Sequence, residues 1–328
     1  MNLTTTPSRQ PPRTAWTIER LKHERAIALG YSLEPASIAS YSSALHSYIT
    51  FCTLHSFPIE PTPDTLSFFV VFMCHHIKPQ SVQAYLSRIC SQLELFFANV
   101  REVRNHRLVT KTLAGCKKFR ATPVSRKDPL SHSDLATLSK AYQHSPSYDD
   151  CLFLTLLLTG FHGLLRLGEL VWPDSHALQD FRKVILRHTV VVDLSAFTFH
   201  LPSHKADRFF EGNRVMIHKT NTADDPLAPF MHYLQLRDHL FPFHPHLWLH
   251  SNGSIPTRRW FITRLRHHFP ASISGHSLRA GGATALAEAG LPPHLIQAMG
   301  RWASDSFKIY IHRHPTLLAG FLFSHASL

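Results

Sequence analysis

The sequence lacks the signatures of several common protein classes. Its five cysteines are widely spaced and form no Cys-x-x-Cys pair, so we expect neither a disulfide framework nor a zinc ribbon. No glycine-rich phosphate-binding loop occurs, which argues against nucleotide hydrolysis. The histidine pairs have no carboxylate or cysteine partner at a useful spacing. We therefore expect no bound metal and no other cofactor.

Long hydrophobic runs are also missing. The longest apolar run, Cys151 to Leu158, is too short to span a bilayer. The first residues are polar and proline-rich, unlike a secretory signal. From these absences we expect no membrane association and a reducing intracellular compartment.

Acidic residues are few compared with basic ones. Lysine and arginine number 34 against 22 aspartates and glutamates, which gives a net charge of +12 with neutral histidines. This excess favours a polyanionic partner, nucleic acid before a membrane, although a basic protein with a solvated surface would have the same composition. The hydrophobic content of 44% suffices for a packed core, and 328 residues suit two domains.

The first third of the chain predicts an all-helical domain over residues 15–118. It follows an arm of residues 1–14 that is rich in Thr, Ser, Pro and Gln, and that we expect to be disordered. Apolar residues then recur at three- and four-residue steps, which is typical of buried helix faces. The three stripes run from Ile38 to Cys52, from Leu66 to Ile77 and from Val82 to Phe96. Base-stacking platforms are the less favoured interpretation of their aromatic residues.

The densest positive charge lies between Arg101 and Lys127, where nine basic residues accompany a single acid. We expect a helix around residues 108–118 and extended chain before Pro123. Residues 119–129 are interpreted as an interdomain linker, and the basic residues as a surface that follows a DNA backbone. An ordinary solvated helix and loop is the alternative. The nine residues are Arg101, Arg104, Arg107, Lys111, Lys117, Lys118, Arg120, Arg126 and Lys127.

Residues 130–315 predict a second, mainly helical domain that contains a small antiparallel sheet. Ser131 or Ser133 could cap its first helix. Short strands are expected at residues 184–186, 190–192, 197–201 and 214–217, because β-branched and aromatic residues cluster or alternate there. After Pro226 the pattern is helical again. The expected fold class is thus mainly α with a small antiparallel β-sheet.

Two arginines, a histidine and a tyrosine are the candidate site residues. His276 and Arg279 are three apart and share one face of a helix. Arg166 lies in an apolar run and needs an anion, which Glu169 could supply from one turn away. With Tyr310, these groups suit phosphodiester transfer through a phosphotyrosine. The alternatives are a surface ion pair, a capping or core histidine and a core tyrosine.

These residues belong to an ordered motif: Arg, Lys, His-x-x-Arg, His or Trp, then Tyr. Residues 130–315 thereby resemble the catalytic core of the tyrosine recombinase (phage-integrase-like) family, and the helical segment before them is similar to its core-binding domain. The stretches from His276 to Thr284 and from Gly300 to Trp302 look closest to recombinases of fungal-type eukaryotic mobile elements. The matching positions are Arg166, Lys205, His276, Arg279, Trp302 and Tyr310.

The resemblance implies a role for each residue. Tyr310 would attack a DNA phosphate and form a 3′-phosphotyrosine, while Arg166 and Arg279 hold the non-bridging oxygens. Lys205 would protonate the departing 5′ oxygen, with His204 and Arg208 as nearby competitors. His276 would bind the phosphate or accept the tyrosine proton.

One position of the motif stays open. Trp302 lies eight residues before Tyr310, whereas many family members have nine at this step. By that count Arg301 would occupy the slot.

The resemblance also implies partners and a setting. We expect double-stranded DNA, a homotetramer on two DNA sites with a monomer or dimer off DNA, metal-independent chemistry, and the nucleus. The apolar tail of residues 316–328 could dock on a neighbouring subunit or on its own core. The alternatives are a type IB topoisomerase and a catalytically silent DNA-binding protein. Target sequence, integration versus excision, and accessory proteins are left open.

Overall fold

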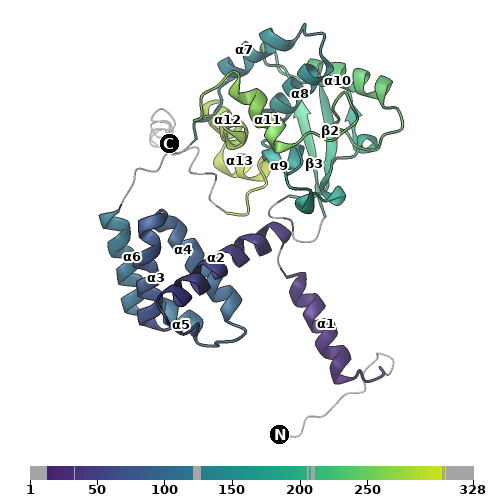
Figure 1. The fold of residues 1–328 in the computed structure, drawn as a ribbon. Coiled ribbons are helices and arrows are strands. Elements are labelled where there is room, and N and C mark those ends of the chain that lie inside the picture. Colours follow the sequence, from purple (N-terminus) through teal and green to yellow (C-terminus); the bar gives the residue numbers. More distant parts are fainter. Residues whose placement is uncertain are drawn as a thin grey trace, which may run out of the picture. The chain divides into compact units, whose positions relative to one another are not determined.

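The computed structural model describes residues 13–32, 34–120, 127–204, 207, 211–304 and 307. The chain divides into two compact units, Met1–Val124 and Ser125–Leu328 (Figure 1). The predicted arm lies almost wholly outside the described residues, as do residues 121–126 of the linker and the whole tail. Those parts of the domain division stay predictions.

The first unit is helical throughout its described residues. Proline occupies the first turn of three helices, where its fixed φ suits the helix. Its lack of an N–H costs nothing there, because the N–H groups of the first turn have no acceptor within the helix. At one of these three helices, which begins at Pro63, Thr62 also caps the start by exchanging hydrogen bonds with Thr65. The helices are α1 (Ile18–Gly30), α2 (Pro35–Leu54), α3 (Pro63–His76), α4 (Pro79–Leu93), α5 (Val100–Asn105) and α6 (Arg107–Phe119).

The core of this unit lies where α2 packs on α4 and α3 packs on α6. Phe69 meets the rings of Tyr48 and Phe51 edge-on at centroid distances of 5.4 and 5.5 Å. The expected buried stripes are confirmed for most of their members, but Ile38 and Phe96 are exposed. Phe96 lies beyond the end of α4, so the helical period no longer directs its side chain to the core.

The second unit is helical with one small sheet, which confirms the predicted fold class. Figure 1 shows the sheet and α10 toward one side of this unit and α12 and α13 toward the other. Its elements are α7 (His132–Tyr142), α8 (Tyr148–His162), α9 (Leu167–Leu170), the 3-10 turns η1 (His176–Leu178), η2 (Phe181–Lys183) and η3 (Arg187–Thr189), β1 (Val191–Val192), β2 (Ala196–Leu201), β3 (Asn213–His218), α10 (Leu227–Leu240), α11 (Arg258–Arg266), α12 (Gly275–Glu288) and α13 (Pro293–Met299).

Helix α8 forms the centre of this unit. Every residue from Cys151 to Phe161 is buried, because α7, α10 and α12 all pack against this helix. The approach of α12 is close: a Cβ added at Gly281 would lie 2.2 Å from the Leu130 carbonyl oxygen, and one at Gly282 would lie 2.2 Å from that of Phe161. Glycine at both positions therefore lets α12 pack directly on the backbone of its neighbours. Of the two candidate caps for α7, Ser131 makes the capping hydrogen bond.

The sheet is antiparallel in the order β1-β2-β3. Phe197 pairs with Ile217 across β2 and β3, and its ring stacks on Phe230 of α10 at 3.8 Å. The expected strand at residues 184–186 was wrong. Among the described residues it forms just an isolated bridge from Leu186 to His246, made by hydrogen bonds from the Arg187 amide to the Pro245 carbonyl oxygen and from the Leu247 amide to the Ile185 carbonyl oxygen.

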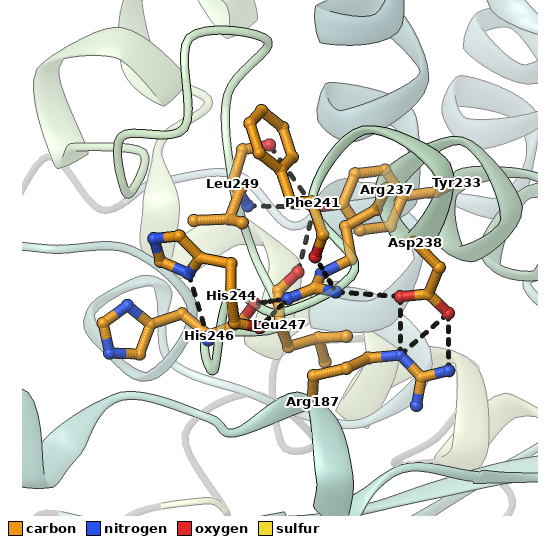
Figure 2. Close-up of polar contacts among 9 residues, drawn as sticks. All are labelled: Arg187, Tyr233, Arg237, Asp238, Phe241, His244, His246, Leu247 and Leu249. Carbon is orange, nitrogen blue, oxygen red and sulfur yellow. Dashed lines mark hydrogen bonds and ion pairs between the residues drawn. The ribbon is translucent and has the colours of Figure 1, made fainter.

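A fully buried arginine fastens that loop to α10 (Figure 2). Arg237 donates to the carbonyl oxygens of Phe241 (2.9 Å), His246 (2.8 Å) and His244, and pairs with Asp238 at 2.9 Å. Asp238 also binds Arg187, at 2.6 Å. Burial would raise the pKa of Asp238, but its bonds to the two arginines hold that pKa below its usual range.

We expect Arg237→Met to destabilise the protein by about 3 to 5 kcal/mol, because it leaves buried carbonyl oxygens without a donor and removes one of the two arginines that bind Asp238. Urea unfolding followed by tryptophan fluorescence would measure the loss. Arg182→Met is the matched control, since the Arg182 side chain is 75% exposed and its change should cost less than about 0.5 kcal/mol. Equal midpoints for the two variants would contradict the role given to Arg237.

Candidate active site

Arg166 stands at the start of α9, held by a carboxylate one turn away. Its backbone N–H donates to one oxygen of Glu169 and its guanidinium to the other, both at 2.9 Å. Glu169 is buried, whereas 26% of the Arg166 side chain is exposed. The pair is thus neither a plain surface contact nor fully enclosed, and the arginine keeps donors for a further anion.

Arg279 lies on α12 and is buried. It donates to the Leu164 carbonyl oxygen at 2.9 Å and to that of Gly300. Its guanidinium carbon lies 4.0 Å from the centroid of the Trp302 ring, a cation–π contact. Backbone carbonyls and an indole therefore fix this cation.

Arg301 enters the same cluster from the end of α13. Its guanidinium donates to the carbonyl oxygens of Leu164 (3.1 Å) and Gly163 (3.2 Å) and lies 3.9 Å from Glu169. Burial lowers the pKa of Arg301, and the nearby Arg166 lowers it further, while Glu169 raises it. Two cations thus face one carboxylate here, which leaves an excess of positive charge for a ligand.

The Leu164 carbonyl oxygen is shared by Arg279 and Arg301. Both Leu164 (φ +50°) and Arg301 (φ +56°) adopt the left-handed conformation, which side-chain-bearing residues rarely do. Each such residue costs on the order of 1 kcal/mol or more, and such strain gathers at functional sites. The backbone is strained where it brings the two arginines together.

The start of α12 sits directly against α9. A Cβ at Gly275 would lie 2.9 Å from the Cβ of Leu167, so glycine permits the approach that brings Arg279 toward Arg166. Ser274 and Ser277 form a capping box at this start. His276 is exposed in the first turn, where helix N–H groups favour an anion.

Two proposed catalytic positions, Lys205 and Tyr310, lie outside the described residues, as do Arg126 and Arg208. Phe307, three residues before Tyr310, is buried with Trp302 at a ring distance of 5.8 Å. The structure thus assembles Arg166, Glu169, Arg279, Arg301 and Trp302.

The basic residues of the first unit fall into two groups. Arg101, Arg104, Lys117 and Arg120 bind neighbouring side chains, namely Glu94, Ser87, Gln83 and His75. Arg107, Lys111 and Lys118 share one exposed face of α6 and have no side-chain partner among the described residues. A Cβ at Gly115, on the same helix, would meet nothing within 4 Å. In the second unit, Lys127 donates to the Ala271 carbonyl oxygen at 2.7 Å.

Of three kinds of comparison with known proteins, the one with solved structures gives matches. No family model matches, and no curated protein does. Solved structures do match: the Tn1549 transposon integrase in complex with a circular intermediate DNA has a TM-score of 0.61 at 13% identity, over 93% of this chain and 98% of that one. A lambda integrase dimer bound to a COC′ core site has a TM-score of 0.53 at 14% identity, over 89% and 76%. The fold is that of the tyrosine recombinases.

Within this tyrosine recombinase fold, one functional feature could not be predicted from the sequence, whereas Arg301 was one of the two candidates for the open slot. The Leu164 carbonyl has no sequence signature, because its role depends on a left-handed backbone. Arg301 was signalled only by its nine-residue distance from Tyr310. No helix in the described part of the chain is long and apolar enough to cross a membrane. The described residues also contain no cluster of three or more His, Cys, Asp or Glu that could hold a metal.

Proposed function

We propose that this protein is a tyrosine recombinase, which breaks and rejoins double-stranded DNA through a phosphotyrosyl bond to Tyr310. The observation that carries the proposal is the arginine cluster. Arg279 and Arg301 bind one carbonyl oxygen, and the Arg166–Glu169 pair lies next to Arg301. A cluster of three arginines suits a phosphate whose negative charge grows in the transition state.

The reaction would proceed by in-line exchange at phosphorus. The Tyr310 oxygen forms a bond to phosphorus while the bond to the 5′ oxygen breaks. Lys205 donates a proton to that oxygen, which leaves as a 5′-hydroxyl, and His276 accepts the proton of the phenol. Attack by another 5′-hydroxyl reverses the step, so no external energy source is required.

We assign the open slot of the motif to Arg301. Its guanidinium is 3.9 Å from Glu169, whose other oxygen binds Arg166, so the three groups form one charged cluster. Trp302 instead lays its ring against Arg279 at 4.0 Å. Arg301 thus acts on the phosphate, and Trp302 positions Arg279.

Partners and setting follow from the proposed activity. The Tn1549 and lambda structures are complexes with DNA, and the Tn1549 enzyme is a transposon integrase. We propose duplex DNA as the substrate, a homotetramer on two sites, action for a fungal-type mobile element, and a nuclear location. The arginines supply the charge that a metal would otherwise provide, so cleavage should persist in excess chelator.

A nicked suicide substrate tests the function. It carries the sequence that flanks the element, with a nick just beyond the scissile phosphate, so that the leaving fragment diffuses away. A recombinase accumulates a protein–DNA adduct that resists denaturant and joins two such sites when the nick is absent. Adduct with relaxation of supercoils but no joining would identify a topoisomerase. Binding without adduct would identify a silent binder.

Salt dependence tests the DNA-binding surface on α6. We expect Lys111→Ala and Lys118→Ala together to flatten the log–log slope of affinity against salt by about one to two units, because each neutralised phosphate contributes roughly −0.9. Fluorescence anisotropy with duplex DNA gives the slope. Lys140→Ala, an exposed lysine of α7, is the control and should leave the slope unchanged. An unchanged slope in the double variant would exclude this face.

A further inference from the structure

A cavity of about 330 Å³ opens between β3, α13 and the end of α8. Its walls include the outward-facing residues Arg214, Met216 and His218 of β3. Arg301 and Met299 line it from the end of α13, and His162 from the end of α8. Neither Arg166 nor Arg279 is among the lining residues, so the cavity is adjacent to the arginine cluster and separate from its centre.

The lining is basic. It contains two arginines and two histidines, Arg214, Arg301, His162 and His218, and no carboxylate. Arg214 is exposed, and its side chain makes no hydrogen bond or ion pair with any residue that the structure describes. The Nε atom of Arg301 is buried and likewise has no hydrogen-bond partner in the described part of the chain. A buried guanidinium donor without an acceptor indicates a site for an anion.

One wall is held in place by a buried carboxylate. Asp224 is 1% exposed and lies 2.7 Å from His132 and 3.3 Å from Nε2 of His162. Burial would raise the pKa of Asp224, but hydrogen bonds from the two histidines and Thr222 hold it well below its usual range. The ionised carboxylate therefore orients the His162 ring, whose other nitrogen bonds to no described residue.

The cavity is larger than one phosphate requires. A water molecule takes up about 30 Å³ of the liquid, so the volume corresponds to roughly ten waters. Met216 and Met299, which are 55% and 45% exposed, provide apolar parts of the lining beside the charged ones. Methionine adapts its shape to a ligand at little cost. The lining thus suits a ligand that has both an anionic group and an apolar group.

We propose that this cavity binds a second nucleotide of the DNA strand, with its phosphate against Arg214 and Arg301 and its sugar against Met216 and Met299. The proposal rests on the proposed function and adds a specific subsite to it. Arg301 would then bridge the phosphate that is cut and the one that is held. Correct placement of the second phosphate would position the strand for attack.

The test uses the full-length protein without DNA. Thymidine monophosphate is titrated while the side-chain NMR signals of the histidines are followed. We expect the signals of His162 and His218 to shift together, and Arg214→Ala to weaken binding by about 10- to 100-fold, because a charge-assisted hydrogen bond is lost. The control Arg182→Ala removes an exposed arginine that does not line the cavity, and should bind as the wild type does.

Two further arms identify the source of the ligand. Duplex DNA should displace thymidine monophosphate, and inorganic phosphate alone should bind more weakly than the nucleotide. Binding that DNA does not displace would mean a site for a free anion and would overturn the proposal. So would an Arg214→Ala variant that binds like the wild type, or an absence of any shift at His162 and His218.

The readout is independent of catalysis. If the protein forms the covalent adduct but does not bind thymidine monophosphate, only the proposed subsite is refuted. A protein that binds the nucleotide in competition with DNA, yet forms no adduct, refutes the proposed recombinase activity and leaves the subsite standing.

Discussion

Tyr310→Phe should abolish covalent attachment to DNA completely and change DNA affinity by less than about twofold. The substitution removes only the hydroxyl oxygen that would attack phosphorus, and no other group can form the phosphotyrosyl bond. Affinity depends on the phosphate contacts of the arginines and lysines, which remain. A free phenol has a pKa of ~10, so roughly one molecule in a thousand is ionised at neutral pH. The proposed mechanism therefore requires the arginines to favour the phenolate as the new bond forms.

Denaturing gels of the suicide substrate measure the adduct, and anisotropy measures the affinity. Peptide mapping of the wild-type adduct should place the DNA on the peptide that contains Tyr310. Tyr233→Phe is the matched control, because that buried hydroxyl donates to the Leu247 carbonyl oxygen at 3.0 Å and accepts from the Leu249 amide at 2.9 Å. It should lower stability and still form adduct. An adduct on Tyr310→Phe would show that another residue is the nucleophile.

Lys205→Ala should slow cleavage of ordinary DNA by about 10² to 10⁴, the usual contribution of general-acid catalysis. Lys205 belongs to the connection between β2 and β3, whose registered pairs end at Leu201 and Asn213. In this connection Asp207 accepts from the Gly212 amide at 2.9 Å, and its own amide donates to the His204 carbonyl oxygen at 2.8 Å. These hydrogen bonds join the described residues of the connection to one another.

A substrate with sulfur at the bridging 5′ position tests the acid itself. Thiolate leaves without a proton, so Lys205→Ala should cleave this substrate nearly as fast as the wild type does. Arg279→Ala, which removes charge stabilisation, should stay slow on both substrates. If sulfur rescues Arg208→Ala or His204→Ala instead, the acid is that residue and the assignment of Lys205 is wrong.

Much of the fold could be predicted because it depends on local periodicity. The apolar stripes at residues 66–77 and 82–96 correspond to α3 and α4. Apolar residues at three- and four-residue steps lie on one side of a helix, and that side is buried. The run at residues 184–186 failed for the opposite reason. A short apolar segment can bury itself against a loop as well as in a sheet, and here the loop at 245–247 takes its hydrogen bonds.

The candidate site divides in the same way. Glu169 could be predicted as the partner of Arg166, because three residues separate them and one helical turn joins them. The meeting of Arg279 with Arg301 could not, because it requires Leu164 and Arg301 to adopt left-handed backbone angles. Those angles depend on the packing of α8, α12 and α13. Contacts between segments so far apart in the sequence cannot be predicted from a local pattern.

The carbonyl oxygen shared by Arg279 and Arg301 has an evolutionary consequence. A substitution that shifts the backbone at Leu164 disturbs both arginines at once. A change at any one of the positions 164, 279 and 301 therefore affects the other two. Related sequences should therefore change at 164, 279 and 301 in concert. A lineage that replaces Arg301 by a shorter donor should carry a compensating change near Leu164, whereas the exposed face of α6 is free of this constraint.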